Sequence, residues 1–263
     1  MRQVISGSTT ARAAGMLLAL AMAGPAGAQT DPTRAMDGEW HYMVAPYFWF
    51  TGLSGDASVK GLPPIPIDAS FSDIISNFDI GLMGHFEMRK DRIGLGSDLL
   101  YVNLGAPVVG PLEGQLGLEV DMRMLIAEGY AFYRVAHGGA AANPSFVDVL
   151  AGVRYFGTSA QLEADALESG KRRLDWVDGM AGARFGLPLG SKVALLGRGD
   201  IAGFGSDFTW SVSGDLATRV SDRWTLGLGW RHMDADYDKG DGLNPSVLNV
   251  TLDGPRLWAA YAW

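Results

Sequence analysis

The sequence predicts an all-β protein: a transmembrane, antiparallel, up-and-down β-barrel of about ten strands, with a short helix in the first extracellular loop. Three observations predict it. A secretory leader opens the chain, apolar and polar residues alternate in segment after segment, and the last residues read D-G-P-R-L-W-A-A-Y-A-W, Asp253 to Trp263. Period-two alternation is typical of a strand, and an apolar face that ends on aromatic rings is typical of a strand that crosses lipid.

Residues 1–28 have the features of a signal peptide. Arg2 and Arg12 supply positive charge, Met16 to Ala23 is an apolar run, and Ala26-Gly27-Ala28 is a small-x-small cleavage pattern. The apolar run is too short to anchor the chain in a bilayer. We therefore expect residues 29–39 to form a periplasmic lead-in and residues 40–263 to form the barrel.

Composition excludes several classes of function. Without the leader, 19 basic residues stand against 29 acidic ones, a formal net charge of −10, and an acidic chain is a poor nucleic-acid binder. There is no cysteine, which excludes disulfides, thiolate nucleophiles and cysteine-ligated metals. No stretch after the leader approaches the roughly 18 apolar residues of a membrane-spanning helix. The sequence leaves a secreted soluble β-protein or an outer-membrane barrel, and aromatic residues near the strand ends favour the barrel.

The alternating segments define the expected strands, at 40–51, 80–90, 93–104, 117–136, 146–156, 174–187, 193–204, 208–220, 224–233 and the C-terminus. Short turns such as 90–92 and 221–223 alternate with longer loops such as 52–79 and 157–173. Short turns on one side and long loops on the other are typical of outer-membrane barrels. Eight or twelve strands remain possible, because Ala57–Lys60 and Ile65–Ala69 could form an additional hairpin.

The segment 117–136 does not keep its polar residues on one face. Asp121 and Arg123 share one parity, whereas Glu128 and Arg134 have the other. We expect a one-residue β-bulge near Ala127 to return all of them to a single polar face.

Alternating charged residues predict a charged lumen. The expected lumen residues are Glu87, Arg89, Asp98, Asp121, Arg123, Asp148, Arg154, Asp178, Arg184, Arg198, Asp200, Asp215, Arg219, Arg231 and Arg256. Barrels of about eight strands have a lumen that side chains fill. Unpaired charges there would be costly, so we expect a network of ion pairs. The alternative is a narrow ion-conducting path through that network.

Two loop segments are further candidates. Phe71, Ile74, Ile75 and Phe78 have the spacing of one helix face, which predicts a short helix at the barrel rim or a plug over the lumen. Asp234, Asp236 and Asp238 resemble the first ligands of a calcium loop, but Lys239 and Pro245 stand where such a loop needs Gly and Glu. We therefore expect a solvated acidic loop, with a loose cation site as the alternative.

Several motifs resemble a broad family of uncharacterised Gram-negative outer-membrane β-barrel proteins, related in style to the opacity and OmpA-type barrels. They are W-x-x-x-x-x-P-Y-x-W-x-x-x-L-x-G at Trp40–Gly55, F-S-D-I-I at 71–75, G-L-M-G at 81–84, G-W-R at 229–231 and D-G-P at 253–255. The resemblance spans most of the chain after the leader and implies a barrel in the outer membrane. It implies no active-site residues.

The sequence predicts a non-enzymatic integral barrel, structural or surface-interacting, with a small porin-like channel for ions or solutes as the alternative. G-x-S-x-G, H-E-x-x-H and phosphate-loop motifs are absent, and His85 with Glu87 is a weak pair for catalysis. No cofactor is expected. The expected partners are outer-membrane lipid, lipopolysaccharide and the barrel-assembly machinery. The machinery would recognise the C-terminal strand through Leu257, Tyr261 and Trp263.

Overall fold

The computed structural model describes residues 37–59, 65–72, 78–107, 119–138, 144–164, 167–239 and 246–263. The expected signal peptide lies outside the described residues, as does most of the lead-in. The strands are β1 (Trp40–Trp49), β2 (Gly52–Val59), β3 (Ile65–Ala69), β4 (Phe78–Lys90), β5 (Ile93–Pro107), β6 (Glu119–Gly138), β7 (Ser145–Ala164), β8 (Leu167–Pro188), β9 (Val193–Gly203), β10 (Phe208–Arg219), β11 (Trp224–Lys239) and β12 (Ser246–Ala262).

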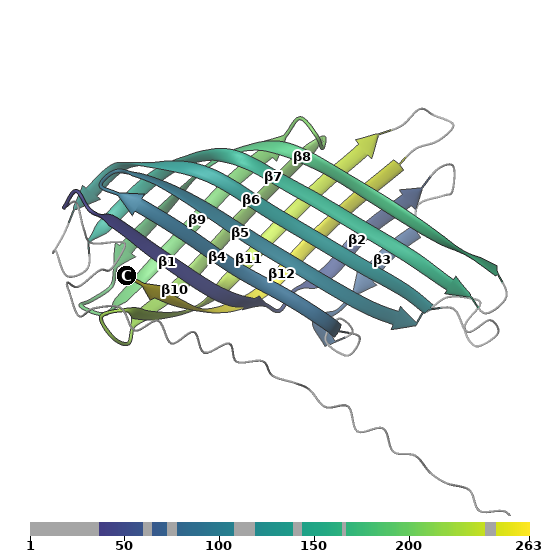
Figure 1. The fold of residues 1–263 in the computed structure, drawn as a ribbon, viewed down its shortest axis with the longest axis horizontal. Coiled ribbons are helices and arrows are strands. Elements are labelled where there is room, and N and C mark those ends of the chain that lie inside the picture. The colour runs from purple at the N-terminus through teal and green to yellow at the C-terminus, as the bar shows by residue number, and fades with distance from the viewer. Residues whose placement is uncertain are drawn as a thin grey trace, which may run out of the picture.

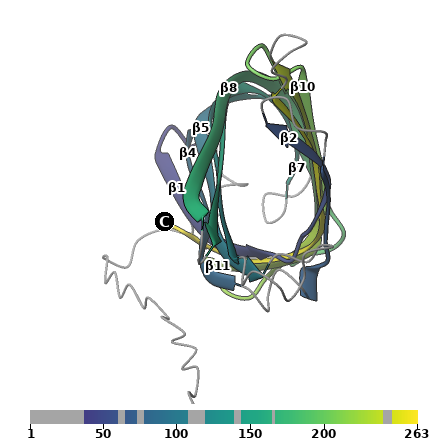
Figure 2. The same cartoon turned by 90° about the vertical axis from the view of Figure 1, so that its right-hand side faces the viewer.

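Ten of these strands close into a barrel. They pair in the order β1-β4-β5-β6-β7-β8-β9-β10-β11-β12, and β12 pairs with β1 to complete the ring. Figure 2 shows the ring end-on, and Figure 1 shows that β1 begins at the end of the barrel where the chain terminates. The prediction of an antiparallel barrel of ten strands is confirmed.

The additional hairpin is present, but outside the ring. β2 continues along β12 where β1 ends, from Asp253↔Gly52 to Ser246↔Val59, and β3 pairs with β2. The pairing of β1 with β4 runs only as far as Pro46↔Gly84. Proline has no N–H to donate, so Pro46 suits the position where the ladder between β1 and β4 stops.

The membrane-facing part of the wall is apolar outside and polar inside. Along β10, Phe208, Trp210 and Val212 are exposed, and the residues between them, such as Thr209 and Ser211, are buried. This alternation follows from the pleat, which sends successive side chains to opposite faces. It is the pattern of a barrel whose outer face meets lipid.

Beyond this band the two faces exchange polarity. The strands β6, β7 and β8 have 20, 20 and 22 residues, about twice the roughly 9–11 that cross a bilayer. In their extracellular part, Arg123 and Arg173 are exposed on the outer face, while Met124 and Trp176 are buried inside. This is the arrangement expected of a β-structure surrounded by water.

The interior of this extension contains an apolar cluster. Its buried members are Tyr47, Trp49, Leu53, Leu100, Val102, Met124, Ile126, Phe156, Trp176, Met233, Ala235, Leu248, Val250 and Leu252. They come from β5 to β8 on one side of the barrel and from β1, β2, β11 and β12 on the other. Trp176 stacks on Phe156 with ring centroids 4.5 Å apart and on Tyr237 at 4.7 Å, which connects β8 with β11.

In β6 the charged residues change from the outer face to the inner face because the two faces exchange polarity along the strand. The prediction of a bulge near Ala127 is wrong. β5 and β6 pair without interruption from Glu119 to Tyr133. The irregularity between β6 and β7 lies instead at Arg134 and Ala136, near the periplasmic turn. Arg123 and Glu128 point to opposite faces because one lies beyond the membrane and the other lies within it.

The expected helix at 71–78 is only partly represented. Residues 71–72 are helical, and Ile74 and Ile75 lie outside the described residues. Phe78 does not belong to a helix, because it is the first residue of β4. Phe71 is 37% exposed, and its ring meets Phe50 edge-on at 5.2 Å. In the parts of the chain that are described, no helix is long and apolar enough to cross a membrane.

Candidate functional site in the barrel lumen

Strand register assembles the lumen charges into rows. One row crosses five neighbouring strands through His85, Asp98, Glu128, Arg154 and Asp178. A second row crosses β6 to β11 through Arg134, Asp148, Arg184, Arg198, Ser213 and Arg231. Opposite charges that face each other across neighbouring strands are close enough to pair directly. The rows therefore bring residues far apart in sequence into one network.

The periplasmic cluster consists of Glu87, Arg134, Asp148 and Arg184. Arg134 holds Asp148 through two hydrogen bonds, Nε to Oδ1 at 2.8 Å and Nη2 to Oδ2 at 3.2 Å. Arg184 donates a hydrogen bond to Asp148 at 3.0 Å, and it donates to both carboxylate oxygens of Glu87 at 2.5 and 3.0 Å. Two-pronged contacts of this kind fix the orientation of both groups as well as their separation.

The central cluster consists of Asp98, Glu128, Arg154, Arg198, Asp200 and Arg231. Glu128 accepts from Arg154 at 2.9 Å, from Arg198 at 2.6 Å and from Arg231 at 3.2 Å. Asp200 accepts from Arg198 and Arg154. Arg231 also reaches Asp98 at 3.4 Å, and the Tyr47 hydroxyl donates to Asp98 at 2.8 Å. Arginines and carboxylates thus bridge one another across the lumen rather than along one strand.

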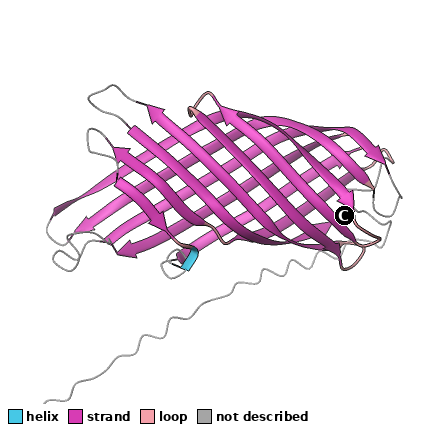
Figure 3. Ribbon diagram, turned by 180° about the vertical axis from the view of Figure 1, so that it is seen from behind, coloured by secondary structure: helices cyan, strands magenta, loops and turns pink. Residues whose placement is uncertain are grey.

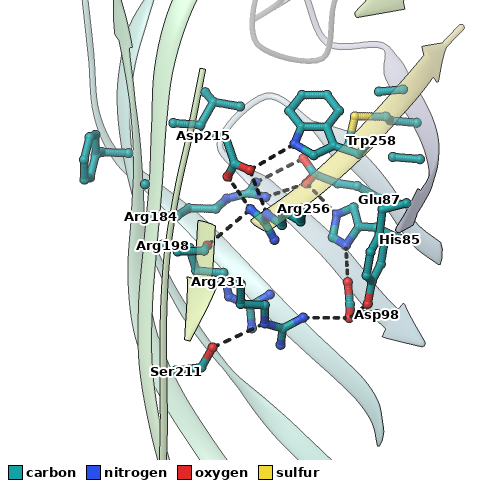
Figure 4. Close-up of a pocket in the computed structure, with 18 of the residues that line it drawn as sticks. His85, Glu87, Asp98, Arg184, Arg198, Ser211, Asp215, Arg231, Arg256 and Trp258 are labelled. Carbon is teal, nitrogen blue, oxygen red and sulfur yellow. Dashed lines mark hydrogen bonds and ion pairs between the residues drawn. The ribbon is translucent and has the colours of Figure 1, made fainter. Parts of the chain in front are cut away.

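A third unit, Asp215 with Arg256, lies on the β10–β12 side. Arg256 contacts both oxygens of Asp215, and the Trp258 indole donates to the same carboxylate at 3.1 Å. Figure 4 shows Arg256 and Arg231 extending toward the residues that come from β4, β5 and β8. The prediction that Arg256 points inward from the C-terminal strand agrees with this position.

Aromatic rings complete the packing around the arginines. The Arg184 guanidinium carbon lies 4.0 Å from the centre of the Phe132 ring, and that of Arg198 lies 4.8 Å from the centre of Tyr130. Glycine makes room for one of these rings. A Cβ at Gly96 would lie 2.4 Å from the Tyr130 ring. Arginine is attracted to aromatic faces, so the rings hold the cations in place without competing for the carboxylates.

A cavity of about 190 Å³ remains within the charged region. His85 lines it, with Nδ1 3.5 Å from Asp98 and Nε2 3.7 Å from Glu87. Both ring nitrogens therefore face carboxylates of the network. His85 and Glu87 thus both line the cavity as members of one network of carboxylates and arginines.

Some predicted lumen residues have other roles. Asp178 is buried, and its carboxylate accepts hydrogen bonds from the backbone N–H groups of Gly205 and Ser206 at 2.9 and 2.7 Å. These bonds hold the β9–β10 turn against β8. Arg89 donates to the Asp91 carbonyl at 2.7 Å, and Arg219 donates to the Ser191 carbonyl at 3.0 Å. These two arginines therefore contact the backbone of periplasmic turns.

The placement of β6 in the lumen network requires a correction. Arg123 is exposed on the outer face, where Nε contacts Asn103 at 3.4 Å, so its assignment to the lumen is wrong. The side chain of Asp121 lies outside the described residues. Glu128 and Arg134 occupy the lumen without the expected bulge, although the list of predicted lumen residues did not include them. The sequence held one signal for their position: Glu128 and Arg134 share a strand face with the apolar residue Ile126 and the aromatic residues Tyr130 and Phe132.

The acidic candidates lie on a strand rather than in a loop. β11 extends to Lys239, so Asp234, Asp236 and Asp238 alternate along one face. Asp234 accepts from the Thr251 hydroxyl at 2.7 Å, and the N–H of Asp238 donates to Asp207 at 2.6 Å. Within the described ranges, no group of three His, Cys, Asp or Glu residues is placed to hold a metal ion.

Comparison with known proteins identifies the fold. No protein-family model and no curated protein matches the chain. The outer membrane protease OmpT from Escherichia coli matches with a TM-score of 0.51 at 8% identity, over 86% of this chain and 98% of that one. The translocator domain of the autotransporter NalP from Neisseria meningitidis (TM-score 0.41, 12% identity) covers 86% of this chain and 89% of its own.

The attachment invasion locus protein Ail of Yersinia pestis also matches, with a TM-score of 0.35 at 8% identity, over 85% of this chain and 98% of that one. The likeness to OmpT, at 8% identity, shows the fold and not the activity. The fold is that of a bacterial outer-membrane β-barrel.

Proposed function

We propose that this protein is a non-enzymatic outer-membrane barrel with a closed lumen, acting as a structural or surface-interacting protein through its extracellular extension. One observation carries the proposal. Two different layers follow one another along the lumen: the ion-paired arginines and carboxylates, and above them the apolar cluster. Each layer is built from side chains of opposite walls, so each spans the lumen.

The charged layer opposes conduction because its charges already satisfy one another. Arg154, Glu128 and Asp148 are almost completely buried and paired. An ion entering this region would have to displace such partners, and breaking a buried pair by removing one partner costs about 3–5 kcal/mol. The apolar cluster adds a second barrier, since a narrow apolar constriction excludes water.

The extension is the part of the protein that can meet other molecules outside the cell. Its outer face is polar, whereas the membrane-facing band below it is apolar, and its interior is filled by the apolar cluster. A filled interior leaves the outer face and the rim as the surfaces available for contact. The likeness to OmpT supports the barrel fold only, and no catalytic residue is transferred from it.

The alternative is a small channel for ions or solutes, and the 190 Å³ cavity among the charged residues favours it. A cavity of this size holds several water molecules, and its walls are polar enough to bind them. If the side chains around it rearrange, the cavity could become part of a water path.

Planar-bilayer recording of the purified, folded barrel separates the two functions. The closed barrel should give no steady conductance steps. A paired variant, Glu128→Ser with Arg198→Ser, keeps the net charge while removing two members of the central cluster. It should stay silent too, because the apolar cluster remains. Steady single-channel steps from the unmodified protein would overturn the closed-lumen proposal and support the channel.

A further inference from the structure

The outer faces of β6, β7 and β8 locate the extracellular boundary of the membrane. Outward residues are apolar, small or aromatic from Val135 to Leu125 on β6, from Val147 to Tyr155 on β7 and from Leu187 to Val177 on β8. Each run covers about the 9–11 residues that a tilted strand needs to cross the hydrocarbon. The next outward residues, Arg123 on β6, Gly157 on β7 and Asp175 on β8, therefore mark the start of the head-group level.

A polar row includes Arg123 and lies one outward position beyond Gly157 and Asp175 on β7 and β8. Strand register places Asn103, Arg123, Ser159 and Arg173 side by side on β5, β6, β7 and β8. Adjacent strands are about 4.8 Å apart, so the two arginine backbones, separated by one strand, are about 10 Å apart. A row with two cations at this spacing can contact two anionic groups of one molecule, or both edges of one large head group.

The neighbours of the row orient the arginines. Arg123 Nε contacts the Asn103 side-chain oxygen at 3.4 Å. Arg173 Nη2 donates to the Tyr155 hydroxyl at 3.0 Å, and its Nε lies 3.1 Å from Asp175. The Arg173 side chain is still 65% exposed, so its guanidinium remains accessible from outside the barrel. Asp175 neutralises part of the charge of Arg173.

We propose that Arg123 and Arg173, with Asn103 and Ser159 between and beside them, bind the phosphate groups of a glycolipid in the outer leaflet. The surface offers suitable partners for both the phosphate groups and the acyl chains of such a ligand. Guanidinium groups bind phosphate through paired hydrogen bonds, and the apolar band directly below accommodates acyl chains. Tyr101 and Tyr155 stand between the two, where aromatic side chains favour the interface. Phosphorylated lipopolysaccharide is the outer-leaflet lipid with this combination of groups.

The site is independent of the closed lumen, because all of its residues lie on the outer face. It also gives a reason for the length of β6 to β8. The strands must continue past the hydrocarbon to present a rigid row of side chains to the head groups, whereas a loop would present them less precisely.

Native mass spectrometry of the detergent-solubilised, folded barrel tests the proposal with lipid A as the probe. The double variant Arg123→Gln with Arg173→Gln should bind bisphosphorylated lipid A roughly tenfold more weakly or worse, because charge-assisted hydrogen bonds are the strong class. Arg123→Lys with Arg173→Lys keeps the charges but loses the paired geometry, and should fall between. Both arginines are on the surface, and heat-modifiable migration on gels will establish that each variant is folded.

A matched control removes the same charge from the other end of the barrel. Lys90 and Lys192 are exposed at the periplasmic turns, and Lys90→Gln with Lys192→Gln should leave lipid A binding unchanged. Equal weakening by the control pair would overturn the site, because net charge alone would then explain the effect. Undiminished binding by the arginine double variant would overturn it as well.

The nature of the ligand is tested on the unmodified protein. Dephosphorylated lipid A should bind more weakly than the bisphosphorylated form, and millimolar inorganic phosphate should not displace the latter. Equal binding of the dephosphorylated lipid would overturn recognition of phosphate. Full displacement by inorganic phosphate would show a free-anion site in place of a lipid site.

Discussion

Glu128 on β6 and Arg154 on β7 face each other across the strand pair, and Arg154 Nε donates to Glu128 Oε1 at 2.9 Å. Both side chains are fully buried. Glu128 also accepts from Arg198 and Arg231, so three arginines from three strands converge on one carboxylate. This carboxylate is therefore the position where a single change affects the central cluster most.

Replacing Glu128 with glutamine should destabilise the barrel by about 3–5 kcal/mol, because the substitution leaves buried arginine charge without its main partner. The measurement is the urea midpoint of unfolding in detergent micelles. Asp222→Asn removes a carboxylate from an exposed periplasmic turn and should change the stability by less than about 0.5 kcal/mol. Equal midpoints for Glu128→Gln and the unmodified protein would contradict this account of the network.

The apolar cluster should stabilise the extension separately from the membrane-embedded ring. Trp176 lies between Phe156 and Tyr237, and Trp176→Ala should cost about 3–5 kcal/mol. We expect the extracellular strands to become sensitive to added protease while the ring keeps its heat-modifiable migration. Trp40→Ala removes an exposed indole at the periplasmic end and serves as the control. Unchanged protease resistance of the Trp176 variant would show that the cluster does not hold the extension together.

Period-two alternation was sufficient to predict the barrel, its ten strands and the inward direction of most charges, because within the membrane the two faces differ sharply in polarity. It failed where the strands leave the membrane. There the faces exchange polarity, so Arg123 was assigned to the lumen, and a bulge that the structure does not contain was invoked to bring Glu128 onto the same face. A sequence pattern shows which residues share a strand face. Whether that face meets lipid or water depends on its depth in the membrane, and the pattern does not give this depth.

Loop assignments failed for a related reason. The acidic run from Asp234 to Asp238 was taken for a loop because its outer residues are as polar as loop residues usually are. The inward residues Ala235 and Tyr237 complete the alternation of β11, and their burial or partial burial is the physical reason that the strand continues. Aspartate on the water-facing side of an extended strand needs no special partner.

Close packing between β6 and β7 should make Gly152 sensitive to substitution. A Cβ at Gly152 would lie 2.1 Å from the backbone oxygen of Gly129, an atom that cannot move without shifting the strand. Gly152→Ala should therefore cost about 1–3 kcal/mol through overpacking, measured as the urea midpoint. Gly129→Ala is a matched control on the partner strand, since a Cβ there meets nothing within 4 Å. A Gly152 variant as stable as the Gly129 variant would contradict the register described for these strands.

Trp263 extends the seam between β1 and β12 that closes the barrel. Trp263 and Tyr42 exchange two backbone hydrogen bonds, at 2.9 and 3.0 Å, and their rings stack with centroids 5.7 Å apart. Deleting Trp263 removes these contacts from the β1–β12 seam and, we propose, part of the signal read by the barrel-assembly machinery. The expected result is a strong loss of folded protein in the outer-membrane fraction, measured by heat-modifiable migration. Trp263→Phe keeps the backbone pair and an aromatic ring, and should assemble normally. Normal insertion of the deletion variant would show that neither the seam nor the assembly signal depends on this residue, and equal loss in both variants would assign the effect to the indole itself.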